Sequence, residues 1–180
     1  MKTKLPILTF CFFLWSGCSE VYVRQPIGDA PRDITAERGL WEGTWLQDDR
    51  ALTVVAADAA KGVLRVSWVE SDGKESACKS ADVYLRNCRD WTFASVRDKD
   101  KSTDLFLWGR VKLREHWILI WTPATTFRSL VEDGRLPGAI TGDGVVLESL
   151  TPEQLQAIVD SSFGVLFDWD EPVILTKVPK

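Results

Sequence analysis

The sequence predicts a mainly β domain, an antiparallel meander that is barrel-like or a strongly curved sheet, with two helices near the C-terminus. Three observations support this prediction. From residue 39 onward, short apolar segments alternate with polar side chains at a period of two. Turn residues separate these segments at short intervals, which favours hairpins between sequential strands. A helical spacing of apolar residues occurs only in the last third of the chain.

The alternation of apolar and polar residues is clearest in two segments. Within residues 63–70, Leu64, Val66 and Trp68 share one face, and turn residues follow at 71–73. Within residues 104–113, one predicted face carries Leu105, Leu107, Val111 and Leu113, and the other carries Phe106, Trp108, Arg110 and Lys112, followed by Arg114. Further strands are predicted over residues 40–47, 51–57, 83–85, 91–96, 117–121, 138–148, 165–167 and 172–178.

Two segments carry helix signals. Residues 125–133 place apolar side chains at helical spacing, and Gly134 provides a stop. The second helix is expected to begin at Thr151, which can cap it, with Pro152 at the first helical position and Gln154 completing a capping box. The buried stripes are Phe127, Leu130 and Val131 in the first helix, and Leu155, Ile158 and Val159 in the second.

The first eighteen residues have the anatomy of a secretory signal peptide. Lys2 and Lys4 give a basic start, residues 5–15 are almost wholly apolar, and two small residues precede Cys18. This pattern resembles the bacterial lipoprotein signal, in which such a cysteine is acylated and becomes the first residue. The resemblance implies that Cys18 carries fatty acids such as palmitate. It also implies a protein anchored in the cell envelope.

Two positions refine this interpretation. In the lipoprotein family the residue after the modified cysteine helps to decide the destination, and Ser19 implies the outer membrane, with the domain facing the periplasm. Trp15 stands three residues before Cys18, where the family usually has leucine. Cleavage after Ser19, which would discard Cys18, and an uncleaved anchor remain alternatives. The apolar run of about eleven residues is short for a spanning helix, which needs roughly 20.

The predicted division of the chain has three parts: a signal peptide over 1–17, a lipidated, flexible tether over 18–38, and one β-rich domain over 39–180. The leader contains two of the 22 basic residues and none of the 26 acidic ones, so the remainder has a formal charge of −6. Such an acidic chain is a poor candidate for binding nucleic acid, which requires clustered lysine and arginine.

Cys78 and Cys88 are the two cysteines beyond the leader, and in an oxidising periplasm they are expected to form a disulfide. Ten residues along one straight strand would separate them by about 33 Å, whereas bridged Cα atoms lie within about 7 Å. The disulfide therefore requires a chain reversal, expected at residues 79–82. The alternative is a redox or metal-binding thiol pair.

The head of the first predicted strand, Gly39-Leu40-Trp41, resembles the Gly-x-Trp motif of lipocalins and related barrels, and Gly43-Thr44-Trp45 repeats it. In that family the tryptophan packs across the base of the barrel and a basic residue from near the end of the chain covers it, for which Lys177 is the counterpart. The Thr-Asp-x-x-Tyr motif of lipocalins is absent from the sequence. The resemblance implies a cavity for a small apolar ligand, and the alternative is that both tryptophans are ordinary core residues.

Two functions are compatible with these patterns. The first is a non-enzymatic binding protein that holds a small hydrophobic or amphiphilic ligand, and the second is a protein-interaction or envelope-assembly accessory with a packed core. The ligand is expected among five tryptophans: Trp41, Trp45, Trp68, Trp117 and Trp121. The row Arg110, Lys112 and Arg114 beside Trp108 is either a surface for anionic groups or a solvated outer face.

An enzymatic function has few candidates in this sequence. His116 is the only histidine, and no nucleophile elbow or phosphate-binding glycine loop accompanies it. Asp168 and Asp170 could share a strand face, but a turn cluster explains them equally. No cofactor and no metal is expected, because the histidine and cysteine ligands of a zinc site are missing.

Overall fold

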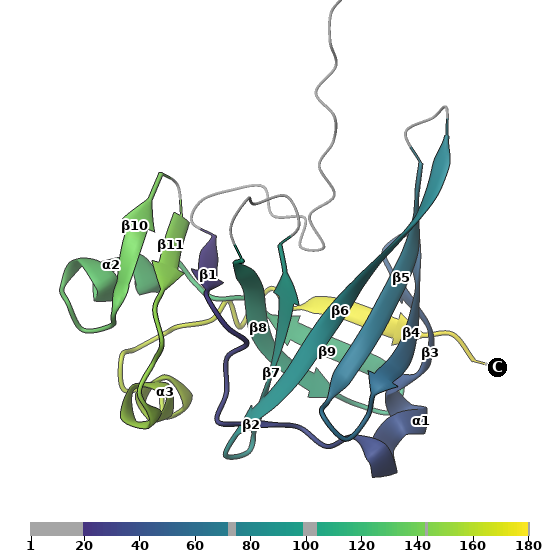
Figure 1. The fold of residues 1–180 in the computed structure, drawn as a ribbon, viewed down its shortest axis with the longest axis horizontal. Coiled ribbons are helices and arrows are strands. Elements are labelled where there is room, and N and C mark those ends of the chain that lie inside the picture. The colour runs from purple at the N-terminus through teal and green to yellow at the C-terminus, as the bar shows by residue number, and fades with distance from the viewer. Residues whose placement is uncertain (1–19, 72–74, 99–103, 143, 180) are drawn as a thin grey trace, which may run out of the picture.

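The computed structural model describes residues 20–71, 75–98, 104–142 and 144–179. Its centre is a closed barrel of eight antiparallel strands (Figure 1), which confirms the predicted mainly β, barrel-like fold. The predicted signal peptide, the lipidation site Cys18 and Ser19 lie outside the described residues. Within them, no helix is both long and apolar enough to cross a membrane.

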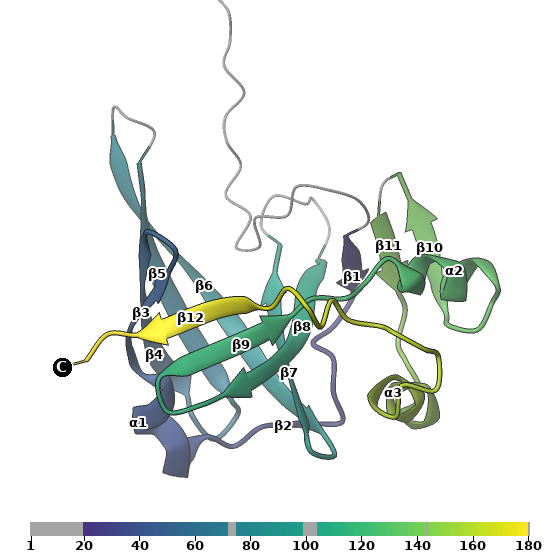
Figure 2. The same cartoon turned by 180° about the vertical axis from the view of Figure 1, so that it is seen from behind.

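The barrel strands follow one another along the chain, apart from the last one. They are β3 (Gly43–Gln47), β4 (Arg50–Asp58), β5 (Val63–Ser71), β6 (Ser76–Cys88), β7 (Trp91–Arg97), β8 (Phe106–Leu113), β9 (Trp117–Trp121) and β12 (Val173–Lys177). Each of β3 to β8 pairs with the next strand along the chain, and β12 pairs with both β9 and β3 and so closes the barrel. Figure 2 shows β12, β9 and β8 side by side.

The alternating sequence forms the barrel wall because successive strand residues point to opposite faces. In β4, Leu52 and Val54 are buried while Thr53 and Val55 are exposed. Inward side chains from all eight strands and the segment before β3 form the barrel core: Ile34, Trp41, Trp45, Leu52, Val54, Leu64, Val66, Ala81, Val83, Leu85, Val96, Val111, Ile118, Ile120 and Leu175.

A second core lies outside the barrel, against β7 and β8. It is covered by α2 (Thr126–Glu132), β10 (Gly138–Thr141), β11 (Gly144–Leu147) and α3 (Pro152–Val159), which lie together at one side of the barrel (Figure 1). This outer core comprises Val21, Val23, Ile27, Cys88, Trp91, Phe93, Phe106, Trp108, Phe127, Leu130, Leu136, Val145, Leu147, Leu155, Ile158, Val159, Leu166 and Phe167. Both helices near the C-terminus are thus confirmed.

The capping box of α3 forms as predicted. The Thr151 hydroxyl accepts from the Gln154 amide N–H at 3.3 Å, and the Gln154 side chain accepts from the Thr151 N–H at 2.9 Å. Pro152 occupies the first turn. Local chemistry was sufficient here because both partners lie within four residues.

The prediction of a flexible tether is wrong for residues 20–38. β1 (Val21–Val23) is fully buried, pairing in parallel with β11 and antiparallel with β8. β2 (Ala30–Pro31) pairs with β6, and η1 (Thr35–Glu37) leads into α1 (Arg38–Trp41). The segment belongs to the fold because its few apolar residues pack into both cores. The polar residues between them leave no apolar pattern in the sequence that would predict this.

The predicted disulfide between Cys78 and Cys88 is also wrong. Both cysteines are free and lie on β6, which continues without a reversal through residues 79–82. Ten strand residues separate the two thiols by about 33 Å. The expected turn is missing because this polar stretch is the part of β6 that pairs with β5 in a long hairpin.

Candidate functional site

The base of the barrel is closed by two tryptophans from adjacent elements. Trp41 ends α1 and Trp45 lies on β3, and neither is more than 1% exposed. The Trp45 indole N–H donates to the Trp41 carbonyl at 2.9 Å. A buried tryptophan whose polar atom is satisfied in this way packs without a desolvation penalty.

Lys177 covers Trp45 from the end of the last strand. Its ammonium lies 5.2 Å from the centre of the Trp45 ring and donates to the Gly39 and Leu40 carbonyls at 2.7 and 2.8 Å. Gly43 makes room for it, because a Cβ there would lie 3.2 Å from the lysine Cε, at a φ of +137°. The covered tryptophan is thus the one in Gly43-Thr44-Trp45, because residues 40 and 41 are helical and the strand begins at Gly43.

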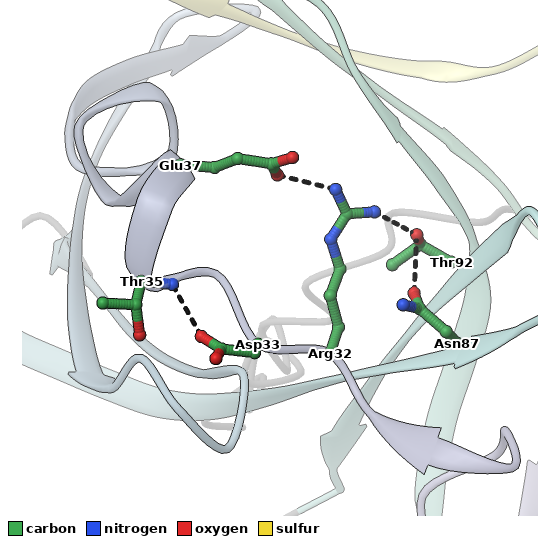
Figure 3. Close-up of polar contacts among 6 residues, drawn as sticks. All are labelled: Arg32, Asp33, Thr35, Glu37, Asn87 and Thr92. Carbon is green, nitrogen blue, oxygen red and sulfur yellow. Dashed lines mark hydrogen bonds and ion pairs between the residues drawn. The ribbon is translucent and has the colours of Figure 1, made fainter.

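Arg32 closes the base beside Trp41. Its guanidinium donates to the Thr92 hydroxyl and to the Glu37 carboxylate, the latter at 2.6 Å, and Thr92 donates to the Asn87 side chain at 3.1 Å (Figure 3). The guanidinium carbon lies 5.8 Å from the centre of the Trp41 ring. This network links the N-terminal segment to the wall strands β6 and β7.

The chain enters the base through a short turn that Asp33 holds in place. The Asp33 carboxylate accepts the Thr35 N–H at 2.8 Å, and hydrogen bonds with Thr35 lower the pKa of Asp33 (Figure 3). The next residue, Ile34, is fully buried in the barrel core, and its N–H donates to the Ala59 carbonyl at 3.0 Å. The segment therefore plugs the barrel.

The opposite end of the barrel is less well covered. β12 runs from Val173 to Lys177 at the base, so Val173 lies at the far rim, together with Leu107 near the start of β8. The β5–β6 hairpin projects from the barrel (Figure 1). Trp68 lies where this hairpin leaves the barrel, since it pairs with Lys79 and residues 76–80 of β6 are all exposed. Trp68, Leu107 and Val173 are only partly buried against the barrel core.

The five predicted ligand-binding tryptophans divide between the two sides of the barrel wall. Trp41, Trp45 and Trp68 belong to the interior or pack against it. In β9 the inward residues are Ile118 and Ile120, so Trp117 and Trp121 lie on the outer face, where Trp117 is 53% exposed. The structure thus places three of the five on the inner side of the wall, two at the base and one towards the opposite end.

An arginine–tryptophan stack on the outer wall was not predicted as a unit. The Arg110 guanidinium carbon lies 4.0 Å from the centre of the Trp91 ring, 5.1 Å from that of Trp169 and 5.3 Å from that of Trp121. Burial lowers the pKa of Arg110, an effect that Asp90 opposes. Trp121 and Arg110 are directly paired across β8 and β9, but nothing in the sequence indicated that Trp169 returns to them.

A cleft of about 450 Å³ lies between the N-terminal segment and the start of α3. Its lining includes Asp29, Arg89, Leu155 and the buried Cys88. Burial, helped by a hydrogen bond with Asp29, raises the pKa of the Cys88 thiol to about 12. A thiol held in its neutral form is a poor nucleophile, so this cleft offers no thiolate chemistry.

The enzymatic candidates do not form a joint site. His116 is exposed in the turn before β9, 4.0 Å from Glu115, whereas the Asp168 N–H bonds to Thr122 just beyond the other end of β9. The five residues of β9 separate these ends by about 16 Å. Burial and the charge of Glu171 raise the pKa of Asp168. Within the described part of the chain, no three histidine, cysteine or acidic residues cluster as metal ligands.

Comparison with known proteins returned no match to a protein family, to a curated protein sequence or to a solved structure.

Proposed function

We propose that this chain is an exported, lipid-anchored envelope protein without enzymatic activity that binds a small hydrophobic or amphiphilic ligand in its barrel. The observation that carries the proposal is the contrast between the two ends of the barrel: Trp41, Arg32 and Lys177 close the base, whereas Trp68, Leu107 and Val173 lie partly exposed towards the opposite rim. A barrel of eight strands is the size at which the interior can hold one small ligand.

The polarity of the interior supports an apolar ligand. The inward residues of the barrel core are aliphatic or aromatic, and the polar network of Arg32 is confined to the base. The buried Trp41 indole N–H has no acceptor among the described residues. A ligand with one polar group could provide that acceptor, which favours an amphiphile such as a fatty acid over a pure hydrocarbon.

The resemblance to lipocalins also supports this function. That family places a tryptophan at the barrel base under a basic residue from near the chain end, and here Trp45 lies under Lys177. The anchor at Cys18 rests on the leader alone. If it is acylated, the lipid lies only three residues before Val21, where β1 begins, so the domain would be held close to the membrane surface.

Binding can be tested with a dibrominated stearic acid, whose bromine atoms quench tryptophan fluorescence over short distances. We expect saturable quenching, and we expect Trp68→Phe to remove a large share of it. Trp117→Phe is the matched control, because Trp117 lies on the outer face. Two results would contradict a ligand in the barrel. One is that Trp68→Phe and Trp117→Phe reduce the quenching equally, and the other is no quenching up to the solubility limit.

Lipidation needs its own test, because its failure would leave the barrel proposal intact. Cells that express the chain are grown with radioactive palmitate, and incorporation is compared between the natural sequence and Cys18→Ala. We expect label only with Cys18 present. An unlabelled natural chain would leave plain secretion or an uncleaved leader.

The alternative function is a protein-interaction accessory with a packed core. It is favoured by the middle of the barrel, where Leu52, Val66, Val96 and Val111 are all at most 6% exposed. The quenching experiment separates the two functions, since a filled barrel would exclude the fatty acid.

A further inference from the structure

The outer faces of β8, β9 and β12 form one continuous surface, which we call the β8–β9–β12 face. Arg110 and Lys112 on β8 lie opposite Trp121 and Leu119 on β9. Leu119 in turn lies opposite Ile174 on β12. Because directly paired residues point to the same side of a sheet, a row of cations runs beside a row of apolar side chains. Figure 2 shows these three strands side by side.

The cations of this face have no carboxylate partner in the part of the chain that the structure describes. Among the described residues, Arg110, Lys112 and Arg114 take part in no ion pair. Elsewhere on the surface, Arg24, Arg38, Arg65, Arg89, Arg97 and Arg128 each lie within 3.2 Å of a carboxylate oxygen. Arg110 and Lys112 on β8 and Arg114 just after it thus place three unpaired cations at alternate positions, in a chain of net charge −4. Asp90 acts on Arg110, and Glu115 follows Arg114 in the turn.

Several apolar side chains of this face are exposed. Trp117 is 53% exposed and Ile174 is 49% exposed, and Leu46 on the neighbouring β3 is 41% exposed. Leu46 and Trp117 both pair with Thr176, so the strip continues across β12. Tryptophan with flanking lysine and arginine is typical of contacts with the interfacial layer of a bilayer, where the ring and the cation stem meet lipid.

Arg110 is held ready for an anion. Trp91 stacks on its guanidinium at 4.0 Å, and Trp121 and Trp169 flank it. No described residue accepts a hydrogen bond from the N–H groups of this guanidinium. A planar group of N–H donors fits the oxygens of a phosphate.

We propose that the β8–β9–β12 face docks on a bilayer surface that carries anionic phospholipids. Arg110, Lys112 and Arg114 bind headgroup phosphates, while Trp117 and Ile174 enter the interfacial layer. Lipid is favoured over an acidic protein segment because a row of apolar side chains, exposed at Trp117 and Ile174, runs beside the cations, which suits a phosphate layer above an apolar one. This docking does not depend on a ligand in the barrel.

The test is binding of the full chain carrying Cys18→Ala to vesicles, measured by sedimentation. Vesicles of phosphatidylglycerol and phosphatidylcholine are compared with phosphatidylcholine alone. The test variant is Lys112→Gln with Arg114→Gln, and the matched control is Arg65→Gln with Arg128→Gln, which removes the same charge elsewhere. All proteins share the same N-terminal segment, so its own affinity for lipid cancels in the comparison.

We expect the test variant to bind anionic vesicles on the order of tenfold or more weakly, because each basic residue near an anionic surface contributes about a factor of five. The control variant should bind as the parent does. Trp117→Ser should weaken binding with no change in charge. Equal loss in test and control variants, or no loss in the test variant, would overturn the proposal.

Two competitors identify the occupant of the face. Inorganic phosphate, at matched ionic strength, should not displace the protein from vesicles, and displacement would point to a free-anion site instead. Poly-glutamate should bind more weakly than the vesicles. Tighter binding of poly-glutamate that is lost in Lys112→Gln with Arg114→Gln would overturn the lipid proposal in favour of an acidic protein partner.

Discussion

Lys177 connects the end of the last strand to the base of the barrel. Its ammonium donates to two carbonyls of α1 and covers the ring of Trp45. We expect Lys177→Met to lower the free energy of unfolding by about 1–2 kcal/mol, because the helix carbonyls lose charged donors while the methionine still covers the ring in part. The measurement is urea unfolding followed by circular dichroism.

Two further variants make the Lys177 prediction specific. Lys177→Arg should retain more than half of the stability, since arginine can still donate to the carbonyls and stack on the ring. Lys61→Met removes an exposed lysine from the β4–β5 turn and should change stability by less than about 0.5 kcal/mol. A loss at Lys61 equal to that at Lys177 would contradict the role of the base contacts.

Cys88 makes stability depend on alkaline pH. Burial raises its pKa from the ordinary value of 9.0 to about 12, so the folded state keeps the proton that the unfolded state loses. The contribution is therefore fully present below about pH 9 and declines as the pH rises toward 12. We expect Cys88→Ala to reduce this decline between pH 8 and about 10, measured from unfolding midpoints.

Chemical labelling gives a second measure of the same group. At pH 8 iodoacetamide should modify the exposed Cys78 well before the buried Cys88, and mass spectrometry of the peptides resolves the two. Comparable rates in the folded protein would show that Cys88 is neither buried nor held in its neutral form.

At the scale of single elements, the β4–β5 turn depends on Gly62. Its φ is +65°, and a Cβ would lie 2.3 Å from the Arg32 carbonyl oxygen and 2.8 Å from that of Leu85. We expect Gly62→Ala to destabilise by about 3 kcal/mol or more, since strain adds to the clash with two backbone atoms. The control is Gly134→Ala, at a φ of +69° but in open space, which should cost about 1 kcal/mol.

Thermal unfolding of both glycine variants provides the measurement. The difference between them isolates the close approach of the N-terminal segment, because the backbone conformation is nearly the same. Equal shifts in midpoint would show that residue 32 does not press against this turn.

Elements with local determinants were predictable from the sequence, and those with distant partners were not. The α3 cap uses Thr151 and Gln154, three residues apart, and forms as predicted. β1 was missed because its three residues acquire their partners from β11, more than 120 positions away. The predicted partner of Lys177 was Trp41, four residues before the observed one, Trp45. The sequence could not separate the two, because each follows a glycine at the same spacing. The helical ending at Trp41 then decided between them.

The long strand β6 was predicted in only a short central piece. Residues 76–80 are exposed on both faces where the hairpin projects from the barrel, so no apolar alternation marks them. Polar residues at 79–82 therefore indicated a turn. The same misinterpretation produced the disulfide, because two cysteines on one unbroken strand cannot meet.

At the scale of the whole molecule, β7 and β8 are shared by two cores. In β7 the inward residues Val96 and Ala94 face the barrel, while Trp91 and Phe93 face the outer core. β8 is divided likewise, with Val111 inward. The sequence predicted that Phe106 and Trp108 share a face of β8 with Arg110 and Lys112, and it showed no element that would cover these two aromatic residues. The cover comes from the last third of the chain, which only the folded structure brings there.

Sharing a wall predicts that the two cores unfold together. Ile34→Ala removes a fully buried side chain from the barrel core, and Phe167→Ala removes one from the outer core. We expect losses of about 2–5 and 3–5 kcal/mol respectively, in each case as a shift of a single transition. The probes are far-ultraviolet circular dichroism and tryptophan fluorescence, which weight the sheet and the aromatic outer core differently. Their transitions should coincide in both variants, since loosening either side of β7 and β8 removes support from the other.

A variant in which the fluorescence changes well before the circular dichroism would show that the outer core unfolds while the barrel remains folded. In that case α2, α3 and β1 would be a separable cover. Ile34→Ala also tests whether residues 20–38 belong to the fold, because the substitution would be nearly neutral if they formed a flexible tether.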